Sequence, residues 1–152
     1  MNNIKRDNIL NWLIIILGVL VIIILLSVPG QAYTTPDINI IIKIESGGNP
    51  KAYNPLHNDR GLMQITPIVL KDYNNLHHNK YTENDLFNPL INKIIGIWYI
   101  DKRIPSLLRH YHKRVTIDNI LTAYNMGIYS VIRGRVDYGY INKYMKIKEG
   151  IQ

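Results

Sequence analysis

A run of nineteen residues without a charge, from Leu10 to Val28, constrains most strongly what this chain of 152 residues can fold into. The run reads LNWLIIILGVLVIIILLSV, and its only polar side chains are Asn11 and Ser27. As a helix it would be about 28 Å long, close to the hydrocarbon thickness of a bilayer. A helix that is apolar on every side would leave a small domain little else to cover it, so we expect a membrane-inserted segment and not a core helix.

This segment is either a retained anchor or a cleaved secretory signal. Gly30 and Ala32 are small residues that suit a signal peptidase, with cleavage at about residue 32. The apolar run exceeds the roughly 7 to 15 residues of such signals, which favours an anchor in the cytoplasmic membrane. Lys5 and Arg6 precede the run and hold the N-terminus in the cytoplasm, so the rest of the chain is expected outside, periplasmic or extracellular. We therefore divide the chain into an anchor or signal sequence, residues 1–32, and one domain, residues 33–152.

The expected domain has no cysteine and carries a positive charge. Without Lys5, Arg6 and Asp7, the 18 basic and 11 acidic residues of the chain become 16 and 10, a net charge of +6. Because thiols are absent, packing without disulfides must hold the fold. The positive charge suits an anionic partner, although it also serves solubility alone. The expected location outside the cytoplasm favours wall polymer or lipid head groups over nucleic acid as that partner.

Short helices separated by Asn, Gly and Pro residues are predicted throughout the domain. Their expected N-caps are Thr35, Thr66, Asn88 and Thr116, each followed by proline or an apolar periodic run. A last helix is expected over Tyr138 to Lys148. The β-branched run at residues 40–42 argues for a strand, but its cap and the spacing of its isoleucines favour a helix. Since no sustained run of strands follows, the domain should be mostly α.

Glu45 closes the first of these helices, shortly before Gly47. It lies seven, four and three residues after Ile38, Ile41 and Ile42, so on a helix it shares their apolar face and points toward the core or a cleft. Burial and the negative end of the helix dipole would both raise its pKa, as a general acid at neutral pH requires. A last-turn glutamate can also bend out into solvent, and this residue alone does not decide between the two.

Further motifs follow Glu45 in order: ES at 45–46, GLMQ at 61–64, AYNMG at 123–127, and Tyr140 within YINKY. A P-x-x-N-x-x-x-G-x-x-Y helix is matched by Pro89, Asn92, Gly96 and Tyr99. Over residues 36–148 the chain resembles the lytic transglycosylases with a goose-type-lysozyme-like (SLT) catalytic domain. Each motif is weak alone, but several in order are hard to obtain by chance. The resemblance implies a mostly α, lysozyme-like fold.

The resemblance also implies that Glu45 is the sole catalytic acid and base. It would protonate the glycosidic oxygen of the MurNAc-β-1,4-GlcNAc bond of peptidoglycan and then accept the proton of the muramoyl 6-hydroxyl, leaving a 1,6-anhydroMurNAc end. One carboxyl suffices because the nucleophile is intramolecular, and no cofactor or metal is required. The implied partners are peptidoglycan glycan strands, the membrane through the N-terminal helix, and an envelope-spanning secretion or phage machinery. Implied substrate-binding residues are Ser46, Gly61, Leu62, Met63, Gln64, Tyr124, Asn125 and Tyr140.

Some of these residues have a second interpretation. Ser46, at a helix end, can cap the local backbone, and Met63 can fill the core. Tyr124 can pack on the apolar stripe of its helix. Tyr144 shares a helical face with Tyr140 and is an alternative neighbour for the acid.

Asp59, two residues before GLMQ, bears on the choice between a sugar hydroxyl and water as the attacking group. In goose-type lysozymes, aspartates near the cleft help to position a hydrolytic water, so a lysozyme-type hydrolase of the same bond is an alternative function. The segment from Asn58 to Gly61 also reads as a turn with Asp59 beside Arg60, and we take this structural interpretation as the default. A non-catalytic wall-binding protein on the same fold and a holin-like membrane-disrupting protein are further hypotheses.

The histidines and one basic segment are expected to be structural. His77, His78, His110 and His112 lack further ligands at a recognised metal spacing, so we predict surface or loop positions and no metal site. The segment KRIPSLLRHYHKR, residues 102–114, suggests contact with wall polymer or lipid phosphate, but a solvated helix end and loop is the default interpretation.

Overall fold

The computed structural model describes Trp12, residues 14–20 and residues 33–151. The chain divides into two units, Met1–Ala32 and Tyr33–Gln152. In the first unit, Trp12 and residues 14–20 are helical. No helix in the described ranges combines the length and the apolar character that crossing a bilayer demands. Most of the run from Leu10 to Val28 and the candidate cleavage site at 30–32 lie outside the described residues, so the anchor and the signal remain predictions.

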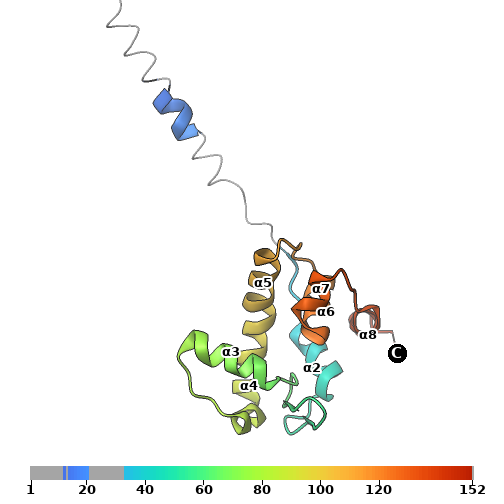
Figure 1. Cartoon of the computed structure of the whole chain (residues 1–152). Coiled ribbons are helices and arrows are strands. Elements are labelled where there is room, and N and C mark those ends of the chain that lie inside the picture. Colours follow the sequence, from blue (N-terminus) through green and yellow to red (C-terminus); the bar gives the residue numbers. More distant parts are fainter. Residues whose placement is uncertain (1–11, 13, 21–32, 152) are drawn as a thin grey trace, which may run out of the picture. The chain divides into compact units, whose positions relative to one another are not determined.

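The second unit is mostly α, as predicted (Figure 1). Its elements in chain order are α2 (Ile38–Ser46), β1 (Tyr53–Asn54), β2 (Asp59–Arg60), α3 (Pro67–His77), η1 (Glu83–Phe87), α4 (Pro89–Trp98), η2 (Tyr99–Arg103), α5 (Ile104–His110), α6 (Ile117–Met126), α7 (Ile128–Ile132) and α8 (Tyr138–Lys148). The two short strands form an antiparallel hairpin in which Tyr53 pairs with Arg60.

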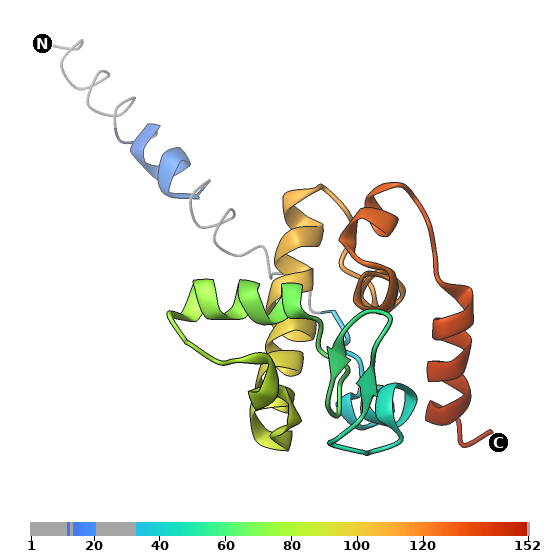
Figure 2. The ribbon, with the colours of Figure 1, turned by 60° about the horizontal axis from the view of Figure 1, so that its bottom comes forward.

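One uninterrupted helical stretch, α4–η2–α5, forms the centre of this unit. It stands between α3 on one side and α6 and α7 on the other (Figures 1 and 2). Ile95, Ile100 and Ile104 along it are completely buried. Its middle section, η2, is π-helical. Pro105 has no N–H to offer the carbonyl of Asp101, and the Tyr33 hydroxyl donates to that carbonyl at 2.7 Å.

The predicted capping residues are confirmed for three helices and wrong for one. Thr66, Asn88 and Thr116 accept backbone N–H groups at the starts of α3, α4 and α6. Helix α2, however, is capped by Asp37 and not by Thr35: the Asp37 carboxylate accepts the N–H of Asn39 at 2.8 Å. An anionic acceptor also suits the positive end of a helix, which explains why the cap lies two residues later than predicted.

The structure differs from the sequence prediction in other short segments. Residues 104–110, predicted as part of a solvated helix end and loop, form α5, whose Ile104, Pro105 and Leu108 are buried. Elements η1, α7 and the β1–β2 hairpin were not predicted, because segments of two to five residues are too short for a periodic pattern to show.

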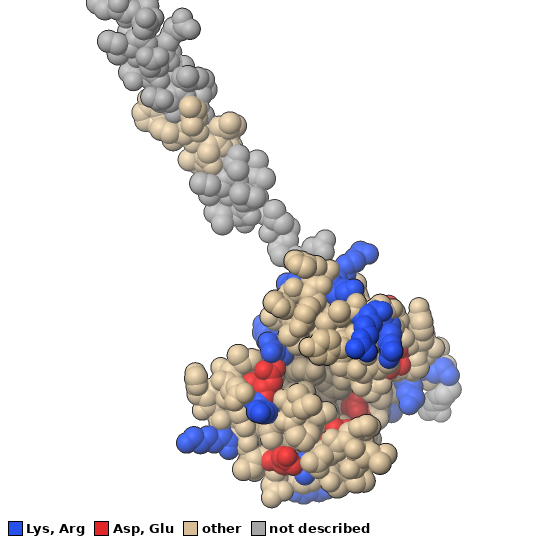
Figure 3. Space-filling model, viewed as in Figure 1, with Lys and Arg blue, Asp and Glu red and all other residues tan. Residues whose placement is uncertain are grey.

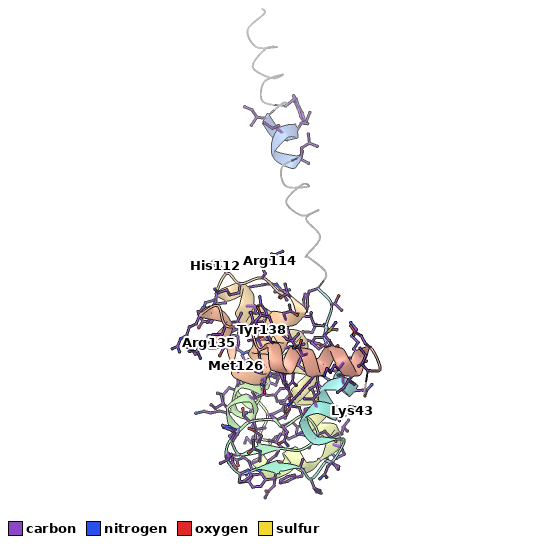
Figure 4. All side chains as sticks on the ribbon, turned by 90° about the vertical axis from the view of Figure 1, so that its right-hand side faces the viewer. Lys43, His112, Arg114, Met126, Arg135 and Tyr138 are labelled. Atoms are coloured by element: carbon purple, nitrogen blue, oxygen red, sulfur yellow. The ribbon has the colours of Figure 1, made fainter. Side chains whose placement is uncertain are left out.

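Helix α8 lies across α2 and covers one side of the unit (Figure 4). Tyr144 of α8 is buried, and its hydroxyl accepts the backbone N–H of Asp37 at 2.7 Å. Ile41, in the middle of α2, is completely buried in the core. Helix α2 is therefore fixed at its start and along its length, which determines where its last residues point.

Candidate active site

Glu45 is the second-last residue of α2, where the helix ends abruptly. Gly47 adopts a left-handed conformation (φ 60°), and its N–H donates to the carbonyl of Lys43 at 3.2 Å. Glycine adopts such a conformation without steric cost and commonly ends a helix. The Glu45 side chain is half-buried between α2 and α8. The prediction that the apolar spacing turns it away from open solvent is confirmed.

Tyr140, on α8, is the direct partner of this carboxyl. Its side chain is buried, and its hydroxyl donates to Glu45 Oε1 at 2.5 Å. Tyr144, the alternative on the same helical face, bonds to the start of α2 instead. The structure thus resolves the choice between the two tyrosines in favour of Tyr140.

Burial and three neighbouring groups determine the charge state of Glu45. Burial has the largest effect and raises the pKa of the carboxyl above its ordinary value of 4.5. The hydrogen bond from Tyr140 lowers the pKa, the nearby Asp59 carboxylate raises it, and the Lys143 ammonium lowers it. The net result is a raised pKa, so the carboxyl holds its proton to higher pH than a free glutamate does. That is the property of a general acid.

Glu45 borders three connected hollows, which together form the cleft. The inner hollow, about 80 Å³, is lined among others by Glu45, Asp59, Gln64, Tyr99, Tyr124 and Asn125. The outer hollow, about 770 Å³, shares several of these residues and adds Asn54, His57, Pro67 and Ile68. The side hollow, about 320 Å³, lies toward α8 and is lined by Glu45, Asn125, Asp137, Gly139, Tyr140 and Lys143. In the space-filling view this face is hollowed in its middle, with acidic side chains visible there (Figure 3).

The GLMQ segment is held in place by Asn92 of α4. The completely buried Asn92 side chain accepts the N–H of Met63 at 2.8 Å and donates to the carbonyls of Arg60 and Leu86 at 2.8 and 2.9 Å. Gly61 has φ 76°, and a Cβ there would collide with the Leu86 carbonyl and the Asn92 amide. A side chain at position 61 is therefore excluded both by conformation and by space.

The remaining residues of the P-x-x-N-x-x-x-G-x-x-Y pattern also have physical roles. Pro89 occupies the first turn of α4 behind its cap Asn88. At Gly96, a Cβ would collide with the side chain of Met63, so this glycine makes room for the GLMQ segment. Tyr99 lines the inner hollow. The pattern therefore describes a helix that supports the cleft wall and contributes one side chain to it.

Gln64 and two residues of the AYN motif, Tyr124 and Asn125, also line the inner hollow. Gln64 has φ 45°, and its Nε2 donates to the carbonyls of Ala52 and Gly61 at 3.2 and 3.0 Å. The Tyr124 hydroxyl donates to the Met63 carbonyl at 2.5 Å, while Asn125 donates to Asp137 Oδ2 at 2.7 Å. A positive φ in a residue other than glycine is uncommon and is often found at functional sites.

Four of the predicted substrate-binding residues are not among those that line the three hollows. Ser46 donates from Oγ to the carbonyls of Leu62 and Ile42 at 2.8 and 3.2 Å and accepts the N–H of Gly48. It links the end of α2 to the GLMQ segment. Gly61, Leu62 and Met63 are buried, so Leu62 and Met63, which the resemblance assigns to substrate binding, belong to the core. Burial of these residues is the reason for the difference, because an exposed apolar loop would be costly.

Asp59 is the main residue of the cleft that the sequence prediction treated as structural. It lies on β2, and its Oδ2 accepts from Asn54 at 3.2 Å, whereas Oδ1 is buried without a hydrogen-bond partner. Burial raises the pKa of this carboxyl, and His57 and the Asn54 bond act against that. Its neighbour Arg60 forms an ion pair with Glu83 at 2.7 Å. Asp59 therefore faces the inner and outer hollows together with Glu45.

Other cleft residues were missed for identifiable reasons. Thr66 was assigned a capping role, which it has, and it also lines the inner and outer hollows. Lys143 follows Tyr140 by one helical turn, a spacing from which it could have been found. Within residues 12, 14–20 and 33–151, no group of three or more His, Cys, Asp or Glu side chains is arranged to hold a metal ion.

Comparison with known proteins gives one family match. The family model described as transglycosylase SLT domain matches residues 32–143 of the chain. No curated protein and no solved structure matches it. The matched range contains Glu45, the GLMQ and AYN segments and Tyr140.

Proposed function

Since the chain belongs to the transglycosylase SLT domain family of lytic transglycosylases, we propose that it cleaves the MurNAc-β-1,4-GlcNAc bond of peptidoglycan and leaves a 1,6-anhydroMurNAc end. The observation that carries this proposal is the Glu45–Tyr140 pair at the junction of the three hollows. It provides one carboxyl with a raised pKa, open to a cleft on both sides.

Glu45 acts first as an acid and then as a base in this proposal. Its proton passes to the glycosidic oxygen, and the bond between that oxygen and the anomeric carbon breaks with its electron pair on the oxygen. The resulting carboxylate then accepts the proton of the muramoyl 6-hydroxyl while that oxygen bonds to the anomeric carbon. One carboxyl performs both transfers because the nucleophile belongs to the substrate itself. The acid is thus regenerated.

Tyr140 stabilises the charged state between the two transfers. Its hydroxyl already donates to Oε1, and a hydrogen bond to a carboxylate is stronger than one to a neutral carboxyl. The Tyr140 pKa is itself raised, by burial first and by the adjacent Glu45 second, so the hydroxyl remains a donor. Glu45 is therefore the proton donor of the pair, and Tyr140 holds a hydrogen bond to the carboxylate that remains after the proton is given up.

Side chains on the walls are placed to bind the sugars. Gln64 uses its amide N–H groups within its own loop, which leaves its carbonyl oxygen for a hydroxyl or acetamido N–H of the substrate. Tyr99 and Tyr124 offer rings at the inner hollow, and Asn125 borders all three hollows. We assign these four residues to glycan binding.

Asp59 supports a second candidate function, lysozyme-type hydrolysis of the same bond. Its Oδ1 lacks a partner and the residue lines the same hollows as Glu45. A carboxylate oxygen in that position can accept a hydrogen bond from a water molecule, which would then replace the 6-hydroxyl as nucleophile. The products distinguish the two functions, because hydrolysis leaves a reducing end.

The location that we propose for this activity is outside the cytoplasm, held to the cytoplasmic membrane by residues 1–32. Support comes from the uncharged run between Leu10 and Val28, from the basic residues before it, and from the site of the proposed substrate in the cell wall. A cleaved signal would give the same location without the tether. Intact mass measurement of the mature protein separates the two.

Mass spectrometry of digested sacculi tests the proposed function. We expect the released disaccharide peptides to be lighter by one water than the products of hydrolysis. Products with reducing ends alone would replace the transglycosylase by the hydrolase, and a wild-type protein that releases neither would refute both activities.

A further inference from the structure

A groove beside the cleft has no part in the proton transfers. It lies between α3, η2, α5 and α7 and has a volume of about 380 Å³. Ile68 borders both this groove and the outer hollow, and Tyr99 borders both the groove and the inner hollow. Because cleft and groove share these residues, they are adjacent on the surface, and a ligand that fills the cleft lies next to the groove.

The groove is lined in part by aliphatic side chains. Ile68 is 80% exposed, although it stands between two hollows. Leu107 and Ile128 add partly buried apolar side chains from α5 and α7. An exposed isoleucine at such a position gains from contact with an apolar part of a ligand.

Two cations and one carboxylate lie on the same walls. Arg103 donates from Nε to Asp72 Oδ2 at 2.6 Å and from Nη2 to Asp72 Oδ1 at 3.2 Å. A guanidinium carries five N–H donors, so this pair leaves donors for a further carboxylate. Lys71 is exposed next to Asp72 and forms no ion pair within the part of the chain that the structure describes. The groove thus has a net positive charge.

We infer that this groove binds the short peptide carried by the lactyl group of muramic acid, an inference that rests on the proposed function. Stem peptides of this kind combine small apolar side chains with free carboxylates, which match the aliphatic walls and the two cations. A neutral sugar chain gains little from such charges and prefers rings on which to stack, and Tyr99 is the one aromatic residue that lines this groove in the described chain. The enzyme therefore binds the peptide of its substrate as well as the glycan.

Binding without turnover tests this inference. The full-length Glu45→Gln protein is sedimented with intact sacculi and with sacculi whose peptides an amidase has removed. We expect the intact sacculi to bind about tenfold more tightly. Adding Lys71→Glu should reduce this preference at least about threefold, because it reverses a charge at the groove. Lys80→Glu, at an exposed lysine outside the groove, should leave the preference unchanged.

The inference is overturned if the protein binds both preparations of sacculi equally, or if Lys71→Glu leaves its preference for intact sacculi unchanged. Either result favours a longer stretch of glycan in the groove. Failure of the proposed function has a different signature. A wild-type protein that prefers intact sacculi but releases no cleavage product would keep the peptide groove and refute the transglycosylase.

Discussion

Replacing Glu45 by Gln removes the proposed proton donor and nearly nothing else. Gln keeps an oxygen that can accept the Tyr140 hydroxyl, now 2.5 Å from Oε1, and it has almost the same volume. General acid and base catalysis by one positioned group contributes at least about 100-fold to a rate. We therefore expect Glu45→Gln to lower the release of soluble fragments from sacculi by about 100-fold or more.

The same substitution should stabilise the domain at neutral and alkaline pH. The pKa of Glu45 is raised above 4.5 in the folded protein, so between these two values the folded state binds more protons than the unfolded state. Stability then falls as pH rises through that window, and Gln avoids the loss. A buried ion costs several kcal/mol, while exchanging a charged for a neutral hydrogen bond loses about 1 kcal/mol. For this half-buried group we expect a net gain of about 1 kcal/mol, or about 3–5 °C in Tm.

Thermal unfolding at two pH values, paired with the activity assay, checks this reasoning. The gain in Tm should appear at about pH 8 and vanish at about pH 3, where the carboxyl is protonated in both states. Glu149→Gln, at an exposed glutamate, is the matched control and should change neither activity nor Tm. Undiminished lysis by Glu45→Gln would remove the mechanism, and a lower Tm at about pH 8 would show that burial does not dominate the electrostatics of this carboxyl.

Three further changes test the surroundings of the acid. Asp59→Asn removes a negative charge that raises the pKa of Glu45. In a plot of activity against pH, the loss of activity on the alkaline side should therefore move to lower pH. An unchanged pH profile would show that the two carboxyls do not interact. Asn92→Ala deletes three buried hydrogen bonds and should cost about 2–4 kcal/mol in urea unfolding, whereas the exposed Asn142→Ala should be neutral. Gly61→Ala should prevent folding or cost more than about 2 kcal/mol, and a soluble variant with unchanged circular dichroism and stability would contradict the tight packing at this position.

The sequence predicted the helices well where a cap and a periodic face agree. Thr116 with the buried Ile120 and Leu121 specifies α6, and Asn88 with Pro89 specifies the start of α4. The predicted start of a helix was wrong where two residues close in the sequence can both cap it. Thr35 and Asp37 can both cap a helix, and the contact between Asp37 and Tyr144, 107 residues away, is invisible to a local pattern.

The position of Glu45 at the cleft was predictable from the sequence, but most of the cleft wall was not. Glu45 is marked by the isoleucine spacing and by the motifs that follow it. The sequence could not show that Met63 is buried, because that depends on the space left by Gly96 on a helix more than thirty residues later. Nor could it show that Arg60 pairs with Glu83, which leaves Asp59 for the cleft. Tertiary contacts of this kind decide which residues of a motif bind substrate and which support it.

The distribution of satisfied and unsatisfied polar groups gives an argument for the site that does not depend on motifs. Asn92 has three partners in the core, whereas Asp59 Oδ1 is buried without a partner in a residue that lines the cleft. A buried oxygen without a partner is costly unless a ligand or water satisfies it. Asp101 Oδ1 also lacks a partner, and it borders none of the three hollows. An unsatisfied oxygen is therefore not sufficient by itself. It indicates a site at Asp59 because the open hollow and the raised pKa of Glu45 occur at the same place, and the three together support the proposed glycan cleft.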